Sequence, residues 1–320
     1  MKIVALDAAT LRMDEADWKP LREFGELVLY DRTPYETDAI VERAGDAAVV
    51  LTNKVPMGAA ELGQLPSLRL ISVLATGYNI IDLQAAREQD VTVCNVPAYS
   101  TASTAQHTLA LMLELCNRVG LHDESVRRGD WIRSPDFAYW KRELVQFEGA
   151  TVGIVGFGRI GRRVAAGAAA LGARILGSAH RRRHTPEDYS FEWAETEDLF
   201  ERADIVSLHC PQTPENFEFV NADLLRRMKS TAFLVNAARG TLVNERDLAA
   251  ALSEGRPAGA AVDVLQREPM APDCPLFKAP NCIITPHIAW SSRPSRLRLL
   301  EETAANIQGF SAGEPRNTVG

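Results

Sequence analysis

Side chains able to bind anions or exchange protons follow apolar runs at three places in the second half of the chain. Arg239 follows "FLVNAA", Glu268 follows "GAAVDVL", which contains Asp263, and His287 follows "CIITP". A guanidinium binds planar anions, and an imidazole exchanges a proton near neutral pH. Ligands of open α/β sheets gather at the carboxyl ends of the strands. These residues are therefore candidates for a site that binds an anion and transfers a proton.

A glycine motif precedes them. "TVGIVGFGRIG" contains Gly156-x-Gly158-x-x-Gly161, directly after an apolar strand and at the start of the helical segment "RIGRRVAAGAAALG". The first glycine permits a tight turn, the second lets a pyrophosphate approach, and the third lets helix and strand pack closely. The helix N-terminus offers unpaired N–H groups to phosphate. A turn without a ligand is the alternative, but the strand–turn–helix context favours a dinucleotide. The predicted contacts here are Gly156, Phe157, Gly158, Arg159, Ile160 and Gly161.

The next strand, "ARILGSA", runs into a basic segment, His180 followed by Arg181–Arg183. NAD-binding folds place an acidic residue about 20 residues after the first glycine, on the ribose hydroxyls. No acidic residue occurs from 149 to 186. Arginine instead matches a 2′-phosphate, which carries roughly two negative charges. A solvated basic loop is the alternative, but the missing acid favours NADP(H) over NAD(H), with Arg181 as first contact, Arg182 as second, and His180 beside them.

Short apolar runs alternate with helical patterns along nearly the whole chain. Runs typical of strands are 2–6, 47–52, 68–75, 91–96, 150–158, 174–179, 204–210, 232–238, 259–265 and 282–287, and helical segments include 159–171, 219–228 and 245–254. Continuous apolar strands alternating with helices indicate parallel sheets covered on both faces. We expect an α/β protein with two doubly wound, Rossmann-like parallel-sheet domains.

The domain boundary is expected near residue 100. Segment 103–119 opens with Ser103-x-x-Gln106, a capping-box pattern, and is apolar nearly all round. We therefore expect a helix buried between domains or between subunits. The segment after it, 127–150, has no periodicity and is interpreted as a long irregular connection, which in compact proteins is often functional.

Composition limits the class of protein. The chain has 320 residues, 46% of them hydrophobic, and a formal net charge of -7, which gives no case for nucleic acid or an acidic membrane surface. The five cysteines form no C-x-x-C pair, so we expect reduced thiols in a cytoplasmic protein. The N-terminal apolar run is too short for a signal peptide, and no segment is long and apolar enough to span a bilayer. No cluster has metal-ligand spacing, so no metal is expected.

The order of these motifs resembles the D-isomer-specific 2-hydroxyacid dehydrogenases. G-x-G-x-x-G, "NAARG", "DVLQREP" and "TPHIAW" follow one another as in that family, and "LTNKVP", "LATGYNIID", "CNVPAYSTASTAQHT" and "SPDFAYW" resemble its glycerate dehydrogenase and hydroxypyruvate (glyoxylate) reductase branch. The resemblance covers almost the full length. It implies a discontinuous substrate-binding domain, 1–100 plus 291–320, and an NAD(P)-binding domain, 101–290.

The resemblance also implies roles for the residues named first. Arg239 would bind the substrate carboxylate, and His287 would donate a proton to the carbonyl oxygen as hydride reaches its carbon. Glu268 would hydrogen-bond and orient His287, and Asp263 would contact the nicotinamide ribose or carboxamide region. Further cofactor contacts are expected at Cys210, Pro211, Ala237, Ala238 and Ala289.

Substrate contacts implied by the family are the backbone amides of the loop with Ala75, Thr76, Gly77 and Tyr78. In some relatives the region of "SPDFAYW" reaches the active site of the partner subunit. We therefore predict a homodimer in which Trp140 lines the neighbouring substrate pocket. The alternative for Trp140 is a packing anchor for the long connection.

The resulting hypothesis is an oxidoreductase that transfers a hydride between NADPH, or NADH, and a small 2-oxo acid such as hydroxypyruvate or glyoxylate, giving the D-2-hydroxy acid. A dinucleotide-binding regulatory protein of the same fold is an alternative from another class. Another alternative is a dehydrogenase for formate, phosphite or 3-phosphoglycerate. The pairing of Glu268 with His287 argues against formate, and the absence of a long C-terminal extension argues against 3-phosphoglycerate.

Overall fold

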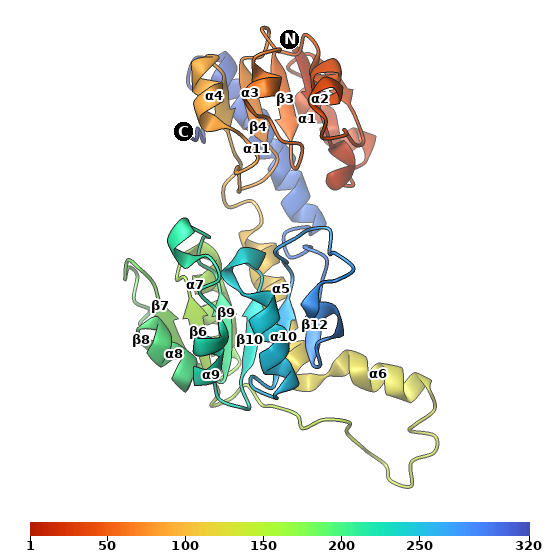
Figure 1. Ribbon diagram of the computed structural model, residues 1–320, viewed down its shortest axis with the longest axis vertical. Helices are drawn as coiled ribbons and strands as arrows, with labels where there is room; N and C mark the ends of the chain where they lie inside the picture. Colours follow the sequence, from red (N-terminus) through yellow and green to blue (C-terminus); the bar gives the residue numbers. More distant parts are fainter. The chain divides into compact units, whose positions relative to one another are not determined.

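The computed structural model describes residues 1–320, which divide into two compact units. Met1–Ser100 and Ser291–Gly320 form the first, and Thr101–Trp290 form the second. Each unit contains one sheet in which every pair of neighbouring strands is parallel, so the predicted fold class is confirmed (Figure 1). None of the helices combines the length and the hydrophobicity that a transmembrane span requires.

The first unit has a five-stranded sheet in the order β2-β1-β3-β4-β5. Its strands are β1 (Lys2–Ala5), β2 (Glu26–Leu29), β3 (Val49–Thr52), β4 (Leu70–Val73) and β5 (Thr92–Cys94). Its helices are α1 (Lys19–Arg22), α2 (Thr37–Ala44), α3 (Ala59–Leu62), α4 (Leu83–Glu88) and α11 (Arg293–Ser311), with short 3-10 turns at Ala8–Thr10 and Glu15–Trp18. The C-terminal helix α11 packs on β4 and α1, which returns the end of the chain to this unit.

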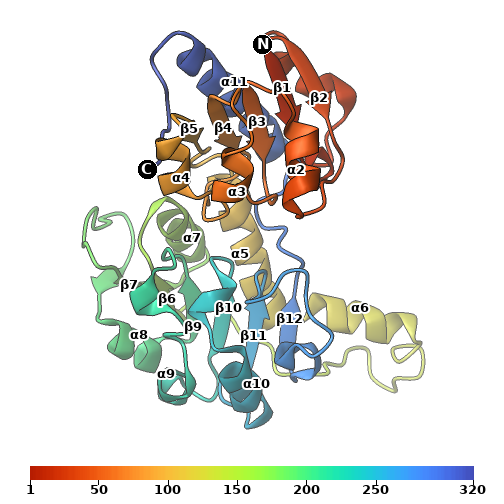
Figure 2. The ribbon, with the colours of Figure 1, turned by 45° about the horizontal axis from the view of Figure 1, so that its top comes forward.

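The second unit has a seven-stranded sheet in the order β12-β11-β10-β9-β6-β7-β8 (Figure 2). Its strands are β6 (Thr151–Val155), β7 (Arg174–Ser178), β8 (Phe191–Trp193), β9 (Ile205–Leu208), β10 (Phe233–Asn236), β11 (Gly259–Val262) and β12 (Cys282–Ile284). Its helices are α5 (Thr101–Asn117), α6 (Val119–Arg127), α7 (Arg159–Ala170), α8 (Thr196–Arg202), α9 (Ala222–Arg227) and α10 (Glu245–Ser253), with 3-10 turns at Pro214–Asn216, Gly240–Leu242 and Pro275–Lys278.

The strand order of this sheet reverses between β6 and β9. From β6 the chain adds β7 and β8 on one side, and then returns to add β9, β10, β11 and β12 on the other. In doubly wound sheets the crevice at such a reversal, at the carboxyl ends of the strands, is where ligands bind. The strands β9, β10 and β11 are buried along their whole length because helices cover both faces of the sheet.

Two strands were not anticipated from the sequence, β2 and β8. Both are edge strands: β8 has only three residues with a charged one in the middle, and β2 is only partly buried and begins with Glu26. The aromatic side chains of β8, Phe191 and Trp193, pack at 4.8 and 5.3 Å between ring centroids against Phe157 in the glycine motif. These contacts between residues far apart in the sequence help to hold β8 at the edge of the sheet.

The long helix begins earlier than predicted. Helix α5 starts at Thr101, so the interpretation of Ser103 as its capping residue was wrong. The Ser103 hydroxyl instead donates to the carbonyl oxygen of Ala289 at 2.7 Å, a tertiary contact that a local pattern does not reveal. The helix also ends before 119, because Arg118 takes the left-handed conformation (φ 51°) and a separate helix, α6, follows. Helix α5 packs on α7, β10 and β11, within one unit.

The third glycine of the motif sets the distance between β6 and α7. A Cβ at Gly161 would lie 2.2 Å from the carbonyl oxygen of Gly156, closer than atoms approach. A Cβ at Gly158, the N-cap of α7, would meet nothing within 4 Å. The two positions are therefore distinguishable by substitution.

We expect Gly161→Ala to destabilise the protein by about 1–3 kcal/mol, as overpacking does, although alanine has the higher helix propensity. Differential scanning calorimetry should show a fall in Tm of roughly 2–4 °C per kcal/mol. Gly158→Ser is the matched control, because serine is a favoured N-cap and its Cβ has space, so its Tm should not fall. Equal Tm values for the two variants would contradict this account of the packing.

Candidate active site

The loop between β6 and α7 has the geometry of a phosphate cradle. Gly156 has a φ of +97°, a conformation that side chains rarely adopt, and a Cβ there would lie 2.3 Å from the amide nitrogen of Cys210. Gly158 is exposed with open space at its Cβ position, and the N-terminus of α7 follows it. Unpaired N–H groups and the positive end of a twelve-residue helix therefore face open space, which fits a bound pyrophosphate.

The other residues of this loop divide by burial. The Phe157 side chain is packed against β8, so only its backbone is available to a ligand. Arg159 is exposed in the first turn of α7, and Ile160 is half-buried behind it. The first turn of α7 carries no acidic side chain, which keeps the helix N-terminus favourable for an anion.

The segment after β9 lies beside the glycine loop, at the reversal of strand order. His209 donates its amide to the Val155 carbonyl at 2.6 Å, and its Nε2 is 2.9 Å from the Ser207 hydroxyl. Burial lowers the pKa of His209 to about 4, so the imidazole is neutral at physiological pH. Cys210 is half-buried and Pro211 exposed, next to Gly156, where the sequence places cofactor contacts.

The basic segment follows β7 on the same side of the sheet as the glycine loop. His180 and all three arginines are exposed, and the Ser178 and Thr196 hydroxyls, 3.0 Å apart, join the end of β7 to the start of α8. Arg182 forms an ion pair with Glu195, the residue before α8. The structure therefore brings a carboxylate to this strand end that the sequence pattern did not reveal, while Arg181 makes no ion pair within the chain.

The loop after β10 carries Arg239, and the side chain of Asn236 holds its backbone in place. The buried Asn236 side chain donates to the Arg239 carbonyl at 2.8 Å and accepts from the Ala238 amide at 3.0 Å. The guanidinium of Arg239 is exposed and donates to the Ala238 carbonyl at 2.7 Å, while Ala237 is buried. A Cβ at the next residue, Gly240, would lie 2.0 Å from the backbone of Leu265, so this loop abuts the loop after β11.

Glu268 and His287 form a direct pair between the loops after β11 and β12. Nδ1 of His287 is 2.6 Å from one carboxylate oxygen, and the other carboxylate oxygen accepts the Leu265 amide at 3.0 Å. A carboxylate only accepts hydrogen bonds, so Nδ1 carries the proton and Nε2 is left for proton exchange. Both side chains are about one-third exposed, accessible to a small molecule.

Asp263 lies beneath the His287 loop rather than open to solvent. Its side chain is 1% exposed, and its carboxylate accepts the amides of Ile288 at 2.9 Å and Ala289 at 2.8 Å and the Thr285 hydroxyl at 2.6 Å. Burial raises its pKa, but hydrogen bonds from His107, Thr285 and the two amides outweigh burial and hold the pKa below its ordinary value. Asp263 is therefore ionised, and its contact with a cofactor stays a prediction, as does that of the buried Ala289.

In the first unit, the loop from Ala75 to Tyr78 follows β4. It is braced by β5 and the segment after it, because Val96 donates its amide to Ala75, the Thr76 hydroxyl donates to Val96, and Asn95 donates to the Thr76 carbonyl at 2.7 Å. The N–H groups of Thr76, Gly77 and Tyr78 have no acceptor within the chain. Successive amides without an acceptor on a braced loop suit an anion, and the carboxylate contact stays a prediction.

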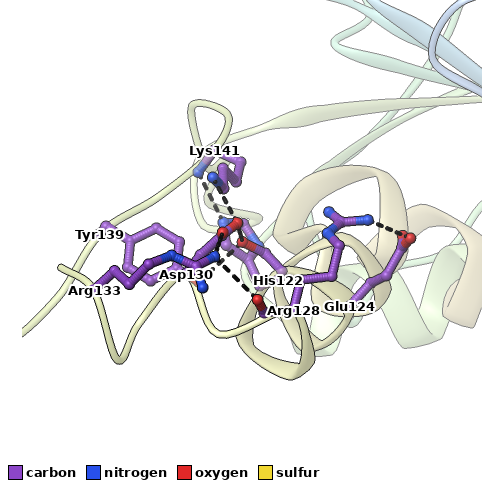
Figure 3. A network of polar contacts seen from close by, with 8 residues as sticks. His122, Glu124, Arg128, Asp130, Arg133, Tyr139 and Lys141 are labelled. Carbon is purple, nitrogen blue, oxygen red and sulfur yellow. Dashed lines mark hydrogen bonds and ion pairs between the residues drawn. The ribbon is translucent and has the colours of Figure 1, made fainter.

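The predicted irregular connection carries Trp140. Residues 128–150 contain no helix or strand, and α6 and the first part of this segment extend away from the remainder of the second unit (Figure 1 and Figure 2), whereas Phe147 packs in its core and Ala150 is buried. We call residues 119–145 the arm. Asp130 holds its two sides together, because it accepts from the Ser125 hydroxyl at 2.6 Å, Arg133 at 2.9 Å and Lys141 at 3.0 Å (Figure 3).

These contacts lower the pKa of Asp130, the Ser125 hydroxyl having the largest effect. Several large apolar side chains of the arm are exposed. Ile132 is 89% exposed, Phe137 93% and Trp140 65%. Polar contacts of Asp130 thus brace the arm, whereas its largest apolar side chains are exposed.

Some residues around the site were missed by the sequence analysis. Asn236 was detectable as a polar residue at the end of an apolar strand, but Glu195 is 13 residues from Arg182 and carries no local signal. His107 and Thr285 were also missed, because their link to Asp263 joins segments more than twenty residues apart. No group of three or more His, Cys, Asp or Glu residues could hold a metal ion.

Comparison with known proteins agrees with this geometry. Residues 109–289 match the family model for the D-isomer specific 2-hydroxyacid dehydrogenase NAD binding domain. The chain is 40% identical to a hydroxypyruvate reductase of Blautia hydrogenotrophica, covering 100% of this chain and 99% of that protein. It is 37% identical to a glycerate dehydrogenase of Methylorubrum extorquens, covering 99% and 98%.

Among solved structures, the NADPH-dependent glyoxylate/hydroxypyruvate reductase of Sinorhizobium meliloti superposes with a TM-score of 0.85 at 26% identity, covering 99% of this chain and 97% of that chain. The fold, the paired Glu268 and His287 and the glycine loop thus occur in a chain whose full length matches these relatives. The protein belongs to the D-isomer-specific 2-hydroxyacid dehydrogenase family.

Proposed function

We propose that this protein reduces a small 2-oxo acid, such as hydroxypyruvate or glyoxylate, to the D-2-hydroxy acid. The observation that carries the proposal is the 2.6 Å pair of Glu268 and His287 at the edge of a sheet that also presents Arg239. The names of the relatives, hydroxypyruvate reductase, glycerate dehydrogenase and glyoxylate reductase, support the same substrate class. A purely regulatory role has no such support, because it needs no proton donor beside an anion site.

In this proposal the bound nicotinamide cofactor supplies the hydride, and the residues of the chain do the rest. Arg239 binds the substrate carboxylate through a planar pair of hydrogen bonds and orients the carbonyl. Nε2 of His287 gives its proton to the carbonyl oxygen, and Glu268 stabilises the imidazolium that exists before this transfer. The amides of Thr76, Gly77 and Tyr78, in the first unit, stay proposed contacts of a substrate anion.

We expect His287→Gln to lower kcat with hydroxypyruvate by about 10²–10⁴-fold, the usual contribution of a general acid. Glu268→Gln should cost less, since an amide oxygen still accepts from Nδ1. Steady-state kinetics with hydroxypyruvate, glyoxylate, pyruvate and 2-oxoisocaproate would measure both effects and rank the substrates.

Glu254→Gln is the matched control for the loss of a carboxylate, because Glu254 is exposed at the end of α10, away from the strand-end loops. An unaltered kcat in His287→Gln would rule out the proposed acid.

We further infer that NADP(H) is favoured over NAD(H). The exposed Arg181 at the end of β7, with no acid from 149 to 186, suits a 2′-phosphate. Arg182 is partly neutralised by Glu195, so Arg181 is proposed as the principal contact. The solved relative from S. meliloti is described as NADPH-dependent, and an imino acid reductase of the same fold was solved with NADPH.

We expect kcat/KM for NADPH to exceed that for NADH, and Arg181→Ala to reduce the ratio by about tenfold or more. A hydrogen bond to a charged group contributes about 1.5–3 kcal/mol. Glu195→Gln should raise kcat/KM for NADPH alone, because it frees Arg182. Arg183→Ala is the matched control and should change neither kcat/KM for NADPH nor the ratio between the two cofactors. Equal efficiency with both cofactors in the unmodified enzyme would refute a phosphate site here.

We also propose that the protein is a homodimer joined through the arm. A second copy is the proposed occupant because an isologous dimer pairs the same apolar surface of each chain, and the arm exposes several large apolar side chains within one short segment, among them Ile132, Phe137 and Trp140. Trp140 is then proposed to line the substrate pocket of the neighbouring subunit. We also propose a cytoplasmic location. All five cysteines are free thiols, as expected in a reducing compartment.

Replacing Ile132 and Phe137 together with aspartate should give a monomer in sedimentation equilibrium, because two charges would be buried in the interface. Leu171→Asp is the control, since it charges an apolar residue that is also exposed but lies outside the arm. In Trp140→Ala, unchanged KM and substrate selectivity would count against its place in the pocket. A dimer that survives the double substitution would show that the arm is not the interface.

A further inference from the structure

His107, on helix α5, contacts the groups that support the His287 loop. Its Nε2 lies 3.1 Å from the Thr285 hydroxyl and 3.4 Å from Oδ1 of Asp263. The imidazole is about one-fifth exposed, and it belongs to neither the glycine loop nor the pair of Glu268 and His287. An apolar side chain at this position could pack equally well but could not make these polar contacts.

The direction of the hydrogen bonds follows from the acceptor at their end. The ionised Asp263 only accepts, so the Thr285 hydroxyl must donate its proton to Oδ1. The Thr285 oxygen then has only lone pairs for His107, which must donate from Nε2. His107, Thr285 and Asp263 thus form a chain with one fixed direction, from helix α5 into the buried carboxylate.

Asp263 in turn fixes the backbone around His287 on both sides. The His287 amide donates to the Asp263 carbonyl at 2.8 Å, and the next two amides, of Ile288 and Ala289, donate to its carboxylate. His287 itself has a φ of +53°, the left-handed region that residues with side chains rarely adopt. Such a conformation persists only where its surroundings determine it, and here one buried carboxylate and one carbonyl do so.

Helix α5 holds the same loop a second time. Ser103, one turn before His107, donates its hydroxyl to the Ala289 carbonyl at 2.7 Å. Residues four apart lie on one face of a helix, so this face presents two polar side chains to the loop. Ser103 contacts the end of the loop at Ala289, and His107 contacts Thr285 and Asp263, which support the loop from inside.

We propose that His107 is a positioning residue, which orients His287 by donating through Thr285 to the carboxylate of Asp263. The inference rests on the proposed role of His287 as the proton donor. His107 touches neither substrate nor cofactor in this proposal. It fixes the side chain of Asp263, and Asp263 fixes the backbone from which His287 reaches Glu268.

The test is steady-state kinetics of the full-length enzyme with hydroxypyruvate and NADPH. His107→Phe keeps a ring of similar size but removes the donor. We expect kcat to fall about 10-fold to 100-fold, the effect of a small misplacement, with KM for both substrates nearly unchanged. His107→Gln places an N–H near the position of Nε2 and should restore most of kcat, whereas the shorter His107→Asn should not.

Two further variants separate positioning from general destabilisation. Gln106→Ala, at an exposed neighbour on α5, should leave kcat unchanged. Thr285→Val removes the hydroxyl that links His107 to Asp263. The kcat of the double variant His107→Phe/Thr285→Val should be no lower than that of the slower single variant, because both substitutions break the same chain of hydrogen bonds. Should His107→Phe not fold, the comparison of His107→Gln with His107→Asn decides: equal kcat values overturn the proposal.

His287→Gln is measured alongside as a reference. If it loses activity while His107→Phe keeps a normal kcat, only the positioning role is refuted. If His287→Gln remains active, the proposed catalytic assignment fails, and the positioning role that rests on it fails too. Additive losses in the double variant would likewise overturn the single path from His107 to Asp263.

Discussion

The parallel alignment of β10, β11 and β12 is the constraint on which the candidate site depends. Parallel neighbours bring their carboxyl ends to one edge, so loops that are far apart in sequence become adjacent there. Arg239, Glu268 and His287 each follow one of these strands. Without that alignment they would be three unrelated polar residues, and the 2.6 Å contact between Glu268 and His287 could not form.

The buried carboxylate of Asp263 is the second element of this arrangement. An unpaired charge at 1% exposure would be strongly unfavourable, and its two oxygens are therefore filled by backbone amides and hydroxyl or imidazole donors. The same contacts hold His287 in a left-handed conformation that costs on the order of 1–3 kcal/mol. The same hydrogen bonds thus stabilise the buried charge of Asp263 and hold the strained backbone of His287.

The cofactor side of the sheet uses backbone more than side chains. Close approach at Gly156 and Gly161 shapes the loop, and the helix N-terminus provides the favourable field for phosphate. Side-chain charge enters only at the end of β7, where Arg181 is unpaired in the chain and Arg182 is shared with Glu195. In the proposed preference for NADP(H), the balance between these two arginines and Glu195 sets the selectivity between the cofactors.

The sequence alone was sufficient for the α/β class, most strands and the glycine loop, because these depend on local periodicity and on residues close together in the chain. It also singled out Arg239, Glu268 and His287, since a polar residue after an apolar strand is visible in one dimension. The edge strands β2 and β8 were not predicted because strands at a sheet edge are only partly buried, and their sequences, ELVL and FEW, include charged residues.

Only the tertiary structure decided which side chains meet. The partner of Arg182, the use of Ser103 as a tether rather than a cap, and the link from His107 to Asp263 all join segments separated along the chain. Hydrogen bonds need positions within a few tenths of an ångström, and spacing in sequence does not specify these. The sequence thus determined which groups are available for chemistry, and packing of helix α5 and three strand ends determined how they are held.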